Sequence, residues 1–140
     1  MMNDRFGVFL RTWLPVFLWM LFIFILSSVP GRDIPNLPIP FFHKGVHFFE
    51  YSVLGALWMR GFTYGRSGVK LFKLSVLAWV LTGIFALSDE WHQTFIPGRS
   101  GRLEDVRFDV ICAIVGILFY SIIRKELGRK GLRANEDCHA

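Results

Sequence analysis

The sequence is poor in cysteine and in charged residues, and both shortages narrow the class of protein. Only two of its 140 residues are cysteine, Cys112 inside an apolar segment and Cys138 in a polar tail, which excludes a scaffold built on disulfides. Charged residues make up 19% of the chain, below the share of about 25% in typical soluble proteins. No repeat or low-complexity tract interrupts the sequence, so we expect a single domain over residues 1–140.

Hydrophobic residues, in contrast, make up 53% of the chain, and the mean hydropathy is +0.42. Four apolar segments approach the length of about 20 residues that crosses a bilayer as a helix. They are Thr12–Val29, Val46–Phe62, Lys70–Ser88 and Val106–Ile123. The first segment lacks a small-residue cleavage site and three similar segments follow it, so we interpret it as a retained helix and not as a secretory signal.

We therefore predict an all-α fold, a four-helix transmembrane bundle that forms one membrane domain. The predicted helices cover about 12–29, 44–62, 70–92 and 105–124, and a polar cytoplasmic tail covers 125–140.

The basic residues predict how the bundle is oriented. Eleven Lys and Arg residues lie at the end with both termini and the connection between the second and third segments, and five lie at the other end. Because short basic loops stay on the cytoplasmic side, we predict that both termini are cytoplasmic. The net charge of +5 then reflects topology and contact with anionic lipid, and we expect no nucleic-acid partner.

Three ionisable clusters lie at the predicted outer ends of the apolar segments. The clusters are His43/Lys44/His47/Glu50, Asp89/Glu90/His92/Gln93 and Asp105/Arg107/Asp109. Ionisable groups near hydrocarbon are costly to bury and usually mark function. Small residues at four-residue spacing lead along the third segment to Glu90, a pattern that favours close helix packing. We therefore predict an outward-facing polar pocket in which His47, Glu90 and Asp105 share one hydrogen-bonded network.

The clusters fit two kinds of chemistry. Histidine titrates near neutral pH and carboxylates beside it can act as bases, so the candidate catalytic residues are His47, Asp89, Glu90 and Asp105. A guanidinium and an ammonium at the outer leaflet suit a phosphate or carboxylate of a lipid headgroup. The candidate ligand-binding residues are Lys44, Tyr51, Gln93, Arg99 and Asp109.

A metal site is an alternative use of the same residues. His43, His47 and Glu50 follow one another at intervals of four and three, which puts three donors on one helix face. The sequence contains no HExxH or CxxC signature, so we expect no metal and no cofactor. The clusters could equally form an interhelical network with a purely structural role. A channel or transporter is less favoured, because the cytoplasmic halves of the segments contain almost no polar residues.

These segments and several short motifs resemble the VanZ-like family, named for an accessory protein linked to teicoplanin resistance. The motifs are Ser27-Ser28-x-Pro30, Lys44-x-x-His47-Phe48-x-x-Tyr51-x-x-Leu54-Gly55 and Asp89-Glu90-x-x-Gln93-x-Phe95-x-Pro97-Gly98-Arg99, followed by Asp105 and Gly116. The sequence departs from the family pattern in having Asp109 where Asn is usual, Ala113 where Gly is common and His43 where an acid is frequent.

The resemblance implies a small multi-pass protein of the bacterial cytoplasmic (inner) membrane. Its expected partners are a membrane lipid and a lipid-linked cell-wall precursor or lipoglycopeptide, and its expected effect is lower susceptibility to teicoplanin. The alternatives are a membrane-embedded enzyme that acts on a phosphorylated lipid headgroup and a non-catalytic scaffold.

Overall fold

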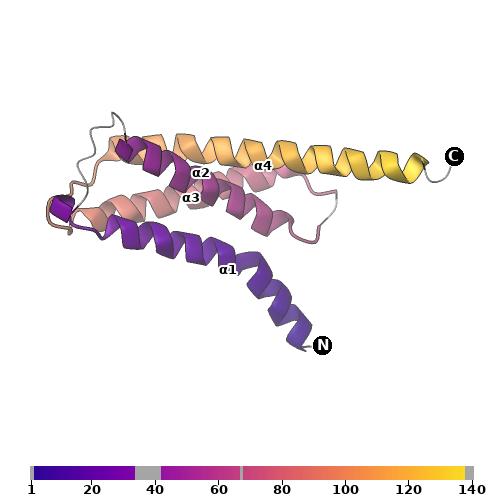
Figure 1. Ribbon diagram of the computed structural model, residues 1–140, viewed down its shortest axis with the longest axis horizontal. Helices are drawn as coiled ribbons and strands as arrows, with labels where there is room; N and C mark the ends of the chain where they lie inside the picture. Colours follow the sequence, from indigo (N-terminus) through magenta and orange to yellow (C-terminus); the bar gives the residue numbers. More distant parts are fainter. Residues whose placement is uncertain (1, 34–41, 67, 138–140) are drawn as a thin grey trace.

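Long helices that alternate in direction make up the fold of the chain (Figure 1). In this computed structural model, the structure describes residues 2–33, 42–66 and 68–137, with side chains over 6–33, 43–66 and 68–129. The helices are α1 (Met2–Ser27), the short 3-10 helix η1 (Gly31–Asp33), α2 (Phe42–Thr63), α3 (Leu71–Gln93) and α4 (Leu103–Asp137). The described residues contain no strand, which confirms the all-α class.

The two outermost helices are longer than the sequence predicted. α1 begins at Met2, about ten residues before the predicted start, and includes Pro15. Proline removes one backbone hydrogen bond of a helix and bends it, and α1 is visibly bent (Figure 1). α4 continues through most of the predicted polar tail to Asp137, while Cys138 and His139 lie outside the described residues.

Three helices of the described chain are long and apolar enough to cross a membrane, over Phe6–Ser27, Leu71–Gln93 and Leu103–Arg129. The predicted fourth span, in α2, does not meet this standard. α2 is too polar for a membrane span, because it includes His47, Glu50 and Arg60. α2 contacts each of the other three long helices, so its polar side chains can meet protein in place of lipid.

The helices pack through small residues, as the spacing in the sequence predicted. Ala78, Thr82 and Ala86 of α3 are all buried, and the same stripe ends at the buried Glu90. A Cβ added to Gly55 of α2 would lie 2.6 Å from the carbonyl oxygen of Ala113 in α4. Close approach of these helix backbones therefore brings the polar residues at their ends together.

The outer surface of the bundle is apolar. Large hydrophobic side chains such as Phe6, Phe72 and Ile122 are more than 60% exposed, on three different helices. A soluble monomer rarely exposes so many large apolar groups, whereas a lipid bilayer covers them without cost. The apolar exterior and the spanning lengths together indicate association with membrane lipid.

Candidate functional site

The candidate site lies at the end of the bundle opposite the two termini (Figure 1). Two connections meet there, because the backbone N–H of Gly31 donates to the carbonyl oxygen of Pro97 at 3.0 Å. Gly98 has a φ of 76°, and a Cβ on Gly31 would overlap the Gly98 backbone, so both positions require glycine. The Pro97-Gly98 turn thereby fixes the segment that leads into α4.

Arg99 joins this turn to the end of α1. Its Nε donates to the carbonyl oxygen of Val29 at 3.2 Å, and its Nη2 donates to that of Leu26 at 3.3 Å. The carbonyl of Leu26 also accepts a hydrogen bond from the backbone N–H of Val29 at 3.2 Å, and the guanidinium adds a second contact at this helix end. The predicted ligand-binding residue Arg99 thus also has a structural role, although its side chain lines the cavity described next.

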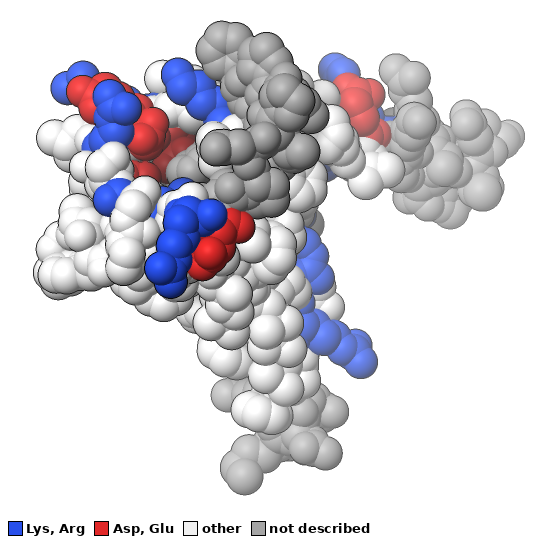
Figure 2. Space-filling model, turned by 60° about the vertical axis from the view of Figure 1, so that its left-hand side comes forward, with Lys and Arg blue, Asp and Glu red and all other residues white. Residues whose placement is uncertain are grey.

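A cavity of about 360 Å³ occupies this end of the bundle. Its lining combines basic and acidic side chains from α2, α3, α4 and the connection between α3 and α4. Figure 2 shows positive and negative side chains close together at this end of the bundle. The lining residues are Gly31, His43, Lys44, His47, Glu90, Gln93, Gly98, Arg99, Ser100, Arg102, Asp105 and Phe108. The cavity lies where three apolar helices end, so its charged groups are at the edge of the membrane-crossing part.

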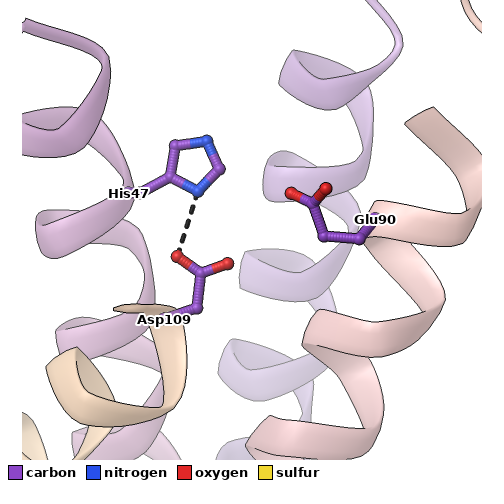
Figure 3. Close-up of side chains that lie close together, drawn as sticks. All are labelled: His47, Glu90 and Asp109. Atoms are coloured by element: carbon purple, nitrogen blue, oxygen red, sulfur yellow. Dashed lines mark hydrogen bonds and ion pairs between the residues drawn. The ribbon is translucent and has the colours of Figure 1, made fainter. Parts of the chain in front are cut away.

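Three ionisable side chains from three helices converge at the cavity (Figure 3). His47 of α2 lies with its Nδ1 3.0 Å from Oδ1 of Asp109 in α4, and Asp109 is completely buried. Glu90 of α3 faces this pair, and donor atoms of all three residues lie within 4.8 Å of one another. Glu90 Oε2 also accepts a hydrogen bond of 2.8 Å from the backbone N–H of Arg102.

Asp89 points into a different environment from its neighbour Glu90. Its Oδ2 accepts hydrogen bonds from Ser27 Oγ at 2.8 Å, Gln93 Nε2 at 3.0 Å and Tyr51 OH at 3.3 Å. These groups are buried where α1, α2 and α3 meet. The carboxylate therefore ties three helices together, and this arrangement favours a structural role for Asp89.

The structure brings most of the predicted site residues together. Those that line the cavity are Lys44, His47, Glu90, Gln93, Arg99 and Asp105, and Asp109 contacts His47 beside it. Asp89 and Tyr51 are not among the lining residues and instead bond to each other. The predicted single network is corrected in one respect: His47 bonds to Asp109 and Glu90 to Arg102, so His47, Glu90 and Asp105 share a cavity and not a continuous hydrogen-bonded chain.

Two contacts of the predicted residues were missed in the sequence. Ser27 donates to Asp89, and Arg102 lines the cavity and supplies the N–H that holds Glu90. Ser27 stands at the outer end of the first apolar segment, a position that could have indicated a polar partner. Arg102 lies in a loop with no periodicity, and the sequence offers no signal for its backbone contact.

Comparison with known proteins identifies the family. The model of a family described as VanZ/LLP1 matches residues 9–124, and this confirms the resemblance seen in the motifs. No curated protein and no solved structure matches the chain. The match extends over most of the sequence, with all of α2 and α3 and most of α1 and α4, and three of these helices are apolar enough to cross a membrane. The chain is therefore a membrane protein that belongs to the VanZ/LLP1 family.

Proposed function

We propose that the protein binds the phosphate-bearing headgroup of an outer-leaflet lipid or lipid-linked cell-wall precursor in this cavity. By holding that molecule it would lower the susceptibility of a bacterium to teicoplanin and related glycopeptides. The observation that carries the proposal is the cavity itself, which is lined by Lys44, Arg99 and Arg102 at the ends of apolar helices. Basic groups in such a place suit a phosphate that lies at the level of lipid headgroups.

The orientation is part of the proposal. We place both termini in the cytoplasm of a bacterium and the cavity on the extracytoplasmic side of the inner membrane, because the basic residues are concentrated at the opposite end. Figure 1 supports the shared location of the termini, since both lie at the end away from η1. A cavity on the outer side would meet the precursors on which glycopeptides act.

The residue roles follow from the contacts. Lys44 is exposed at the cavity and its Nζ lies 5.8 Å from the centre of the Phe108 ring, so its ammonium can turn toward a bound phosphate. Arg99 uses only part of its guanidinium on the end of α1, which leaves further N–H groups for a ligand. Glu90, Gln93 and Asp105 can accept or donate hydrogen bonds to the polar part of a headgroup.

Binding of phosphatidylglycerol to the purified full chain tests the proposal, with diacylglycerol, a lipid without phosphate, for comparison. We expect Lys44→Gln to weaken binding of phosphatidylglycerol by about 10–100-fold, because a charge-assisted contact contributes about 1.5–3 kcal/mol. Lys73→Gln is the matched control, since Lys73 is an exposed lysine on α3 outside the cavity lining. Equal affinity of the two variants, or equal retention of both lipids, would contradict a headgroup site in the cavity.

A second candidate is an enzyme that acts on the same phosphorylated headgroup. The observation in its favour is the His47–Asp109 pair, because a carboxylate that holds Nδ1 orients the imidazole with Nε2 directed away from it (Figure 3). Incubation of the reconstituted protein with a lipid diphosphate, with release of inorganic phosphate as the readout, distinguishes the two. Release that His47→Gln abolishes supports the enzyme, and binding without release supports the headgroup-binding protein.

A further inference from the structure

We propose that His47, Glu90 and Asp109 form a binding site for one divalent transition-metal cation, with Zn²⁺ as the representative ion. Each residue comes from a different helix, and their donor atoms lie within 4.8 Å of one another (Figure 3). The spacing of the sequence pointed instead to His43, His47 and Glu50 on one helix as the possible metal ligands. In the structure, the donors that lie beside His47 are instead the carboxylates of Glu90 in α3 and Asp109 in α4.

The donor set fits such a cation. One imidazole nitrogen and two carboxylates are common ligands of Zn²⁺ and related ions, at about 2.0–2.2 Å from the metal. Two ligands at that distance in tetrahedral geometry are themselves about 3.3–3.6 Å apart. His47 Nδ1 and Asp109 Oδ1 are 3.0 Å apart, so a small outward shift of either side chain would give the pair the separation of two ligands. The cation would take the place of the proton that the pair now shares, and Glu90 would approach by rotation of its side chain.

The buried carboxylate of Asp109 is an independent indication of a ligand. Asp109 has no exposed surface, and its Oδ2 has no hydrogen-bond partner within the described part of the chain. A buried carboxylate oxygen without a partner is costly, and a bound cation removes that cost. Figure 3 shows this second oxygen on the side of Asp109 that faces Glu90, where a shared cation would lie.

Within the described residues, neither of the arginines that line the cavity forms an ion pair with Asp109 or Glu90. The ion pair of Asp109 is with His47, Arg102 pairs through its guanidinium with Glu104 at 3.8 Å, and Arg99 is bonded to the end of α1. The Arg102 backbone N–H bonds to one oxygen of Glu90, the kind of outer contact that metal ligands usually have, and the other oxygen can turn toward a cation. A histidine nitrogen among the donors favours a transition-metal ion over Mg²⁺ or Ca²⁺, which prefer oxygen ligands.

The metal site does not depend on the proposed headgroup site. If both exist, the cation would add positive charge beside Lys44 and leave a coordination position on the cavity side for a phosphate oxygen. Binding of Zn²⁺ alone tests the metal site, whereas binding of phosphatidylglycerol tests the headgroup site, so each can fail without the other.

The experiment measures Zn²⁺ bound to the full chain in detergent after treatment with a chelator, by calorimetry and by metal content. All proteins carry Cys138→Ser, because adjacent Cys138 and His139 could bind Zn²⁺ adventitiously. We expect one Zn²⁺ per chain, and an affinity more than about 100-fold lower in Asp109→Asn and in Glu90→Gln, since even outer-shell changes cost about 10–100-fold. If either Asp109→Asn or Glu90→Gln does not fold, the other variant still tests the site.

The matched controls are Glu104→Gln, which removes an exposed carboxylate of the same helix end, and His92→Gln, which removes another histidine at the same end of the bundle. Both should keep the affinity of the parent protein. Absence of stoichiometric Zn²⁺ from the parent would overturn the proposal. Equal affinity in the parent and in folded Asp109→Asn or Glu90→Gln would also overturn it.

Discussion

Asp89 and Glu90 are neighbours in the sequence with different surroundings in the structure. Asp89 accepts three buried side-chain hydrogen bonds from three helices, while Glu90 lines the cavity and is held by one backbone N–H. Consecutive residues of a helix point about 100° apart, so one carboxylate faces α1 and α2 while the other faces α4. Substitutions at these two positions should therefore have different consequences.

Asp89→Ala should lower the thermal stability of the protein. The change leaves the Ser27, Tyr51 and Gln93 donors buried without their acceptor, at a cost of roughly 1–3 kcal/mol for each donor that finds no new partner. The measurement is the unfolding temperature in detergent. Ser88→Ala, at an exposed position one residue earlier, is the control and should unfold near the temperature of the original protein. Equal unfolding temperatures would mean that Asp89 does not hold the helices together.

Glu90→Gln should impair function more than stability. The amide oxygen of glutamine can still accept the hydrogen bond from the Arg102 N–H, so the fold is retained, whereas the negative charge in the cavity is lost. We expect the teicoplanin susceptibility of cells with this variant to equal that of cells without the protein, at unchanged protein level and nearly unchanged unfolding temperature. A large fall in unfolding temperature would instead indicate that Glu90 serves only to join the helices.

At the scale of the helices, α2 and α4 are held together by glycine at close contacts. A Cβ on Gly116 would overlap the backbone oxygen of Ser52, and the Oγ of Ser52 donates to the carbonyl oxygen of Cys112 at 2.9 Å. This contact positions His47 and Asp109, which lie on the same two helices nearer the cavity. The site therefore depends on how closely the helices approach.

Gly116→Ala should destabilise the bundle, and Gly128→Ala on the same helix should not. Overpacking of a close contact costs about 1–3 kcal/mol, whereas Gly128 has nothing within 4 Å of an added Cβ and alanine there favours the helix by up to about 1 kcal/mol. Thermal unfolding of both variants in the same detergent is the measurement. Similar stability of the two would show that α2 and α4 are not in the close contact described.

The periodic features of the helices could be predicted from the sequence, and the individual side-chain pairs between helices could not. Apolar segment length and the spacing of Ala78, Thr82 and Ala86 indicated the helices and their buried faces, because these patterns are local. The pairing of His47 with Asp109 depends on the register of two packed helices, which sequence spacing does not contain. For the same reason the sequence could not show that Asp89 faces Ser27 and not the cavity.

For the whole molecule, the orientation determines which compartment the cavity meets. A reporter fused after Gly68 or after Ala140 should report a cytoplasmic location, and a reporter fused within residues 94–104 should report a location outside the cytoplasm. The reason is that the basic residues are concentrated near Gly68 and the two termini. Alkaline phosphatase and a fluorescent protein, which are active on opposite sides of the membrane, provide the readout. Cytoplasmic activity of the fusion within 94–104 would reverse the orientation and separate the cavity from the outer leaflet.

The proposed headgroup site is tested most directly by an experimental structure of the protein in a phosphatidylglycerol bilayer. The account predicts density for a lipid phosphate inside the cavity, within about 3 Å of Lys44 or Arg102, the distance of a charge-assisted hydrogen bond. It also predicts that the same density is absent from a Lys44→Gln, Arg102→Gln double variant. Lipid phosphate found only along the outer faces of α1, α3 and α4, with none in the cavity, would contradict it.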